Sequence, residues 1–178
     1  HGRKVPMIVI RGELRVGDEK TFIRRALELE DAVVLMESPG GDLKPGLEIG
    51  KVIRLKAYTT LVRKAARCES ACALAWLAGA PLMMEAEGTV GFHAVWEDTA
   101  EGGVSSSGNA LVGAYANALG LPDKVIEYIT EAQPEDMRYL TFRDAEEIGL
   151  LVRRYVPRGN DIVPDGKPQR PHPLASAP

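Results

Sequence analysis

The feature of this sequence that most constrains its fold is an alternation of short apolar runs with longer amphipathic segments. The short runs are rich in β-branched residues and stop at glycine, proline or polar residues, which predicts buried strands at 5–14, 31–38, 58–66, 89–97 and 150–156. The segments between them repeat apolar residues at helical spacing, at 17–30, 43–56, 67–81, 110–141 (two helices) and 141–151. Strands that alternate with helices predict an α/β fold, in which a mostly parallel sheet is covered by helices on both sides.

Length and charge limit the number of domains and the classes of partner. The chain has 178 residues, and we expect one domain at 1–156 followed by a proline-rich polar tail at 157–178. Its 25 acidic and 22 basic residues give no excess of positive charge, which argues against nucleic acid as a partner. The longest apolar run, 71–84, is shorter than the roughly 20 residues of a membrane-spanning helix. We therefore expect a soluble protein with no membrane span, no metal and no cofactor.

Two turns in the sequence follow predicted strands and lead into predicted helices. One is "SPGGD", with Gly40, Gly41 and Asp42, and the other is "CES", which ends at Ser70. Parallel α/β sheets bind ligands at the carboxyl ends of their strands, so the two turns are expected to face one crevice. The N–H groups of Gly41 and Ala71 could there hold an anionic oxygen, beside the Ser70 hydroxyl. Gly40 and Asp42 of the first turn are candidate substrate-binding residues.

A serine hydroxyl is a weak nucleophile unless a neighbouring base removes its proton. Of the three histidines, His1 looks like the remnant of a purification tag and His172 lies in the tail. His93 alone lies in an apolar predicted strand, from which it can reach the same strand ends. Taken singly, Ser70 is more simply a helix N-cap and His93 a half-buried structural residue. Their combination with the glycine turn favours catalysis.

The only two cysteines of the chain, Cys68 and Cys72, flank Ser70. They could form a disulfide or remain two small buried thiols, and the sequence does not decide between these alternatives. A disulfide would indicate an oxidising compartment. We expect a periplasmic or secreted protein whose native beginning is missing, and a cytoplasmic location stays open as the alternative.

The stretches "ESPGGDLKPGLEIGKVIRLK", "RCESACALAWLAGA" and "GTVGFHAV" together resemble the proteolytic subunit of the Clp protease (ClpP). That family has the same order of strand, "SPGG", helix, serine, helix and histidine-bearing strand. The resemblance implies a βαβ spiral of the ClpP/crotonase type, with Ser70 as nucleophile, His93 as general base, and Gly41 and Ala71 as the oxyanion hole. The closest likeness is to short Clp-like bacterial proteins, often exported, whose serine is flanked by cysteines.

The sequence departs from the ClpP pattern at the third member of the catalytic triad. The position of the family's acid falls on Met137, and Asp136, one residue earlier, is the candidate acid. A backbone carbonyl, Asn109 or a water could orient His93 instead. The stretch between His93 and Met137 is also shorter than the family's handle helix. We therefore expect a small homo-oligomer that works without ATP, rather than the double-ring chamber.

Three functions fit these observations. The first is a serine peptidase-like hydrolase that forms an acyl-enzyme on a peptide or protein substrate. The second is a catalytically weak or inactive Clp-like binding or assembly module, for which Met137 is the best argument. The third is a crotonase-type enzyme acting on acyl-CoA, which needs the same pair of oxyanion amides but no serine. The presence of both Ser70 and His93 favours the hydrolase.

Overall fold

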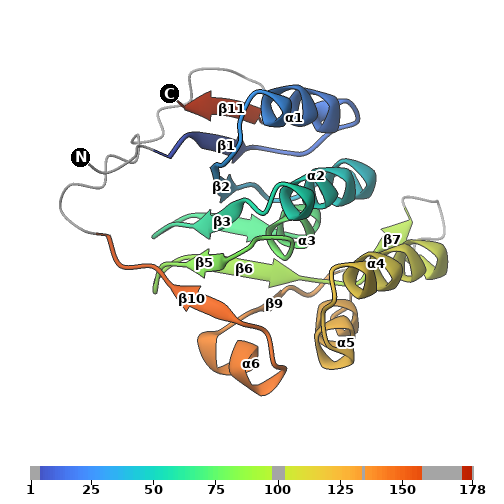
Figure 1. The fold of residues 1–178 in the computed structure, drawn as a ribbon. Helices are drawn as coiled ribbons and strands as arrows, with labels where there is room; N and C mark the ends of the chain where they lie inside the picture. The colour runs from blue at the N-terminus through green and yellow to red at the C-terminus, as the bar shows by residue number, and fades with distance from the viewer. Residues whose placement is uncertain (1–4, 98–102, 134, 158–173, 178) are drawn as a thin grey trace.

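The structure is a computed structural model that describes residues 5–97, 103–133, 135–157 and 174–177. Its helices are α1 (Asp18–Leu27), α2 (Leu43–Leu55), α3 (Ala71–Trp76), α4 (Ser106–Ala118), α5 (Asp123–Glu131) and α6 (Phe142–Glu147). Its strands are β1 (Met7–Arg11), β2 (Val33–Glu37), β3 (Thr59–Val62), β4 (Arg67–Glu69), β5 (Leu82–Met84), β6 (Thr89–Phe92), β7 (Trp96–Glu97), β8 (Gly103–Val104), β9 (Arg138–Tyr139), β10 (Val152–Arg154) and β11 (Leu174–Ala177). Figure 1 shows the strands stacked as a ladder with the helices beside them.

The larger sheet has the strand order β10-β5-β3-β2-β1-β11. Every neighbouring pair in it is parallel except β1 with β11. The predicted α/β fold, with a mostly parallel sheet flanked by helices, is therefore confirmed. Because all five parallel strands end at the same edge, the turn after β2 is brought to the edge where a ligand site is expected.

The main core lies between this sheet and helices α1, α2 and α3, which lie along one side of it (Figure 1). Strand β1 alternates, so that Ile8 and Ile10 are buried while Met7, Val9 and Arg11 remain partly exposed. On the opposite face, Val9, Leu35 and Leu61 line a hollow of about 380 Å³. Helices on both sides were expected, but no residue of a described helix lines this hollow.

A second, smaller sheet of order β4-β6-β9 was not expected from the sequence. Strand β4 is only three residues long, too short to give an alternating pattern that marks a strand. It pairs in parallel with β6, and a bridge from Ser38 to Cys68 ties it to the end of β2. The second sheet thus holds the chain just before Ser70 between the two segments that carry the other candidate site residues.

Two segments differ from the expectation. The apolar stretch 67–81 forms a helix only over Ala71–Trp76, and Leu82–Met84 becomes strand β5, because Gly79 and Pro81 interrupt helical spacing. In the tail, Leu174–Ala177 forms β11, which pairs antiparallel with β1. Residues 158–173 and 178 of the tail lie outside the described residues. In the ranges described, no helix is long and apolar enough to cross a bilayer.

Tyr115 on α4 fastens this helix to α3. Its hydroxyl donates to the Leu74 carbonyl at 2.9 Å, and burial raises the pKa of the phenol. We expect Tyr115→Phe to lower the free energy of unfolding by about 1–2 kcal/mol, because the Leu74 carbonyl would lose its side-chain donor while the apolar contacts stay. Urea denaturation followed by circular dichroism measures this change. An unchanged midpoint would show that the hydrogen bond adds nothing net.

Candidate active site

Ser70 occupies a sharp turn between strand β4 and helix α3. Its backbone has φ 53° and ψ −125°, in a region that non-glycine residues rarely adopt, at a cost of about 1–3 kcal/mol. The Ser70 N–H donates to the Gly91 carbonyl at 2.9 Å, which holds the turn against β6. Although Ser70 is the N-cap residue of α3, its side chain makes no capping hydrogen bond. The hydroxyl is therefore left available for another role.

The glycine turn after β2 packs directly against this serine turn. Gly40 and Gly41 have φ values of 97° and 129°, which side chains disfavour. A Cβ at Gly40 would lie 2.7 Å from the Ser70 Cβ, and one at Gly41 would lie 2.2 Å from the Leu14 carbonyl oxygen. The two turns can approach this closely because position 40 is glycine, and the glycine at position 41 lets the first turn lie against Leu14.

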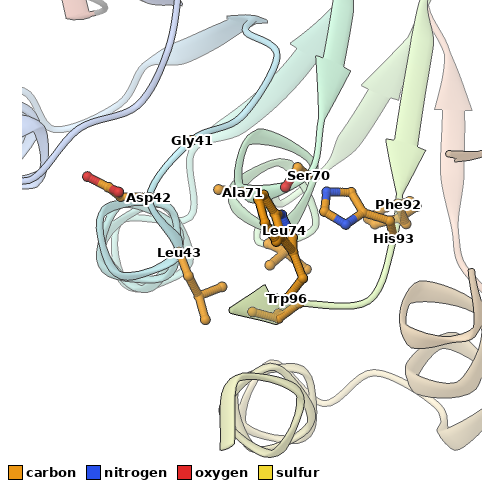
Figure 2. Close-up of a pocket in the computed structure, with 10 residues that line it drawn as sticks. Gly41, Asp42, Leu43, Ser70, Ala71, Leu74, Phe92, His93 and Trp96 are labelled. Carbon is orange, nitrogen blue, oxygen red and sulfur yellow. The ribbon is translucent and has the colours of Figure 1, made fainter. Parts of the chain in front are cut away.

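Two backbone N–H groups beside Ser70 have no protein acceptor in the described residues. They belong to Gly41 and Ala71, the pair expected to form an oxyanion hole, and both residues line the same pocket as Ser70. Gly40 is buried, lies outside the pocket lining and donates its N–H to Ser38 Oγ at 3.1 Å. Asp42 lines the pocket, but its carboxylate accepts a hydrogen bond from the Val16 N–H and points away from Ser70 (Figure 2).

The pocket has a volume of about 240 Å³ and a mostly apolar wall. Figure 2 shows it between the start of α2, the start of α3 and the segment that follows β6. Trp96 stands at its mouth and is 50% exposed. The other apolar side chains of the lining are Leu43, Leu74, Phe92 and Val95.

His93 follows directly after β6 and is half-buried. In Figure 2 one nitrogen of its ring points toward the Ser70 hydroxyl, and the two residues line the same pocket. The other nitrogen, Nδ1, lies 2.7 Å from the Ala94 carbonyl oxygen. A carbonyl can only accept, so in the neutral ring this contact places the proton on Nδ1 and leaves Nε2 as the acceptor toward Ser70. No hydrogen bond joins the two side chains in the described chain.

Asp136, the candidate third member of the triad, is exposed and does not line the pocket. Strand β9 pairs antiparallel with β6, with Phe92 opposite Arg138, so the next pair along this register is His93 with Met137. Met137 indeed packs against Gly91, two residues before His93. Asp136 lies in a bend before β9, and its N–H donates to the Gln133 carbonyl at 2.9 Å. Among the residues that the structure describes, the group that contacts His93 Nδ1 is the Ala94 carbonyl.

A buried carboxylate, that of Glu69, lies directly before Ser70. Glu69 is 7% exposed and accepts hydrogen bonds from the Arg67 guanidinium and from the Tyr139 hydroxyl, the latter at 2.8 Å. Because Arg67 and Glu69 lie on β4 and Tyr139 lies on β9, this cluster connects the two outer strands of the smaller sheet, beside Ser70. A glutamate in a short polar stretch carries no pattern that would indicate burial.

Cys68 and Cys72 are joined by a disulfide that spans Ser70, with 5.3 Å between their Cα atoms. Both residues are 0% exposed. Of the two alternatives that the sequence left open, the structure has the bridge. It connects the strand before the serine turn to the helix after it.

No protein-family model matches the sequence, and no curated protein matches it significantly. Solved structures resemble the fold. A serine-to-alanine mutant of the 1510-N membrane-bound stomatin-specific protease has a TM-score of 0.62 at 16% identity, over 83% of this chain and 78% of that one. A lysine-to-alanine mutant of that protease in complex with a substrate peptide has a TM-score of 0.57 at 16% identity, over 83% and 76% of the two chains. At this identity the likeness shows a shared fold.

Proposed function

We propose that this protein is a serine peptidase-like hydrolase with Ser70 as nucleophile and His93 as general base. One observation carries the proposal: a serine hydroxyl that makes no capping hydrogen bond, an imidazole nitrogen turned toward it and two backbone N–H groups without an acceptor in the described chain line one pocket. A helix-capping serine or a structural histidine would not need the other two features. Three of the parts required for acyl transfer are thus adjacent.

In the proposed reaction His93 Nε2 takes the proton of Ser70 while Oγ attacks the carbonyl carbon of the substrate. The carbonyl oxygen becomes an oxyanion between the Gly41 and Ala71 N–H groups. His93 then gives the proton to the leaving amine, the C–N bond breaks, and an acyl-enzyme ester remains on Ser70. A water molecule, deprotonated by the same ring, hydrolyses the ester and restores the hydroxyl.

The choice of histidine as base follows from the lining of the pocket. The 1510-N protease of the two comparison structures carries a serine-to-alanine change in one and a lysine-to-alanine change in the other. Among the described residues lining the pocket of this chain there is no lysine, whereas His93 is present. The neighbour's complex with a substrate peptide supports a peptide substrate here. The Cys68–Cys72 bridge supports an exported protein, because structural disulfides form in oxidising compartments.

We expect a fluorophosphonate probe to form a covalent adduct with the wild-type protein at Ser70 and nowhere else. Intact-mass spectrometry after incubation measures the adduct, and peptide mapping locates it. Ser70→Ala should give no adduct because it removes the attacking oxygen, while Ser107→Ala on α4, outside the pocket lining, should label as the wild type does.

The same experiment separates the competing functions. A folded wild-type protein that stays unlabelled after long incubation would contradict the hydrolase and favour a binding or assembly module. An unlabelled protein that binds coenzyme A tightly in calorimetry would instead favour an acyl-CoA enzyme of the crotonase type.

A further inference from the structure

The orientation of His93 depends on a main-chain group, the Ala94 carbonyl. Its oxygen lies 2.7 Å from Nδ1 of the preceding residue's ring. In a serine triad a buried carboxylate holds this nitrogen and fixes the tautomer. A carbonyl can do the same only if its own direction is fixed. The residue that fixes the orientation of the peptide group between Ala94 and Val95 is therefore part of the site.

The partner of that peptide group is the side chain of Asn109. The Val95 N–H donates to Asn109 Oδ1 at 3.0 Å. The Ala94 carbonyl and the Val95 N–H belong to one planar trans peptide unit, so their bonds point in nearly opposite directions. An acceptor that fixes the direction of the N–H therefore also fixes the direction of the carbonyl toward the ring.

An amide is suited to this position because it both accepts and donates. Asn109 Nδ2 donates to the Val95 carbonyl at 3.3 Å and to the Ser105 carbonyl at 2.9 Å. The residue lies in the first turns of α4, whose N-terminus is capped by Ser105, and α4 is fastened to α3 by Tyr115. The side chain thus connects a fixed helix to the chain that follows His93.

We propose that Asn109 is a positioning residue for His93, acting through the peptide group between Ala94 and Val95. The inference rests on the proposed function, since it explains how a site without an acid at Nδ1 keeps Nε2 unprotonated toward Ser70. Loss of the Asn109 amide removes the acceptor that fixes this peptide group, while the flanking bonds from the Ala94 N–H to the Ala132 carbonyl and from the Ser105 N–H to the Val95 carbonyl remain. The ring then loses its fixed acceptor and samples both tautomers, of which only the Nδ1–H form can accept the Ser70 proton.

The test compares Asn109→Ala with the wild type and with Asn117→Ala, which changes an exposed asparagine of the same helix. Two quantities are measured for fluorophosphonate labelling: the saturating rate constant and the probe concentration at half saturation. For Asn109→Ala the rate constant is expected to fall roughly tenfold, less than the hundredfold that direct displacement of a reacting group by about 1 Å can cost. The half-saturating concentration should not change, and Asn117→Ala should match the wild type.

A second readout follows the tautomer itself. Nitrogen-15 NMR of the imidazole is expected to show the Nδ1–H form of His93 in the wild type and a mixture in Asn109→Ala, a change that lost stability alone does not produce. If Asn109→Ala does not fold, Asn109→Asp, which keeps an acceptor for the Val95 N–H, should retain the Nδ1–H form.

The outcomes against the inference are distinct from those against the hydrolase. A folded Asn109→Ala protein with a wild-type rate constant and an unmixed tautomer would overturn the positioning role while leaving Ser70 as nucleophile. A mixed tautomer in folded Asn109→Asp would also count against it. A wild-type protein that does not label would remove the proposed function itself.

Discussion

Replacing His93 with alanine is expected to lower the rate of fluorophosphonate labelling at Ser70 by about 10²- to 10⁴-fold, the range that a positioned general base contributes. Without the ring, no described side chain in the pocket lining can accept the Ser70 proton, because the Asp42 carboxylate points away and already accepts from the Val16 N–H. The ring is half-buried and follows the end of β6, so its loss should leave the fold intact.

The measurement is the pseudo-first-order rate of adduct formation by mass spectrometry, with circular dichroism to verify the fold. Asp136→Asn is the matched comparison, because it tests the remaining acid candidate. We expect this variant to label within about twofold of the wild type, as expected for a surface substitution away from the reacting groups. Labelling of His93→Ala at the wild-type rate would show that the imidazole is not the base. A loss in Asp136→Asn equal to that in His93→Ala would instead restore Asp136 to the triad.

The sequence predicted which segments meet at the site because the rule involved is simple. Gly41, Ser70 and His93 each follow a strand, and parallel strands present their ends at one edge. Periodicity identified the strands before Gly41 and His93 without any knowledge of contacts, although it did not identify β4, the short strand before Ser70. The glycine pair and the isolated histidine were unusual enough to be noticed in an otherwise apolar setting.

The sequence offered the groups that hold His93 only as alternatives and could not choose among them. The Ala94 carbonyl is a main-chain atom, which every residue has, so no residue type marks it. Asn109 appeared only as one alternative among several, since its role depends on where α4 begins relative to Val95. The choice between Asp136 and Met137 depended on the register of β9, a strand of two residues that periodicity does not detect.

The second sheet and the tail strand were missed for related reasons. Strand β4 is identified by its pairing with β6 rather than by its own three residues. Strand β11 lies in a segment whose proline-rich composition favours an irregular chain, although its last residues pair with β1. Composition describes a segment on average, so it does not predict that a short stretch within the segment pairs with the edge strand of a sheet.

The Cys68–Cys72 bridge is expected to matter most for the conformation of Ser70. Closing so short a loop stabilises the folded state by about 2 kcal/mol through the entropy of the unfolded chain. The unusual backbone of Ser70 costs about 1–3 kcal/mol, which is of the same size. Because Cys68 precedes the turn and Cys72 follows it, the bridge opposes relaxation of the turn toward ordinary φ values. Without it, the hydroxyl is free to move away from His93.

We therefore expect the Cys68→Ala/Cys72→Ala double variant to lose about 2 kcal/mol of unfolding free energy. Its saturating rate of labelling at Ser70 should fall roughly a hundredfold, which is the effect of misplacing a reacting atom by about 1 Å. Leu82→Ala is the control, because it removes a buried side chain of β5 outside the pocket lining at a cost of about 2–5 kcal/mol. If both variants label at the wild-type rate well below their melting temperatures, the bridge contributes only stability. If both slow down equally, lost stability alone explains the effect. Slow labelling in the double variant alone is the result expected of a bridge that holds the nucleophile. Because both cysteines are fully buried, treating the native protein with dithiothreitol should not reproduce this slow labelling.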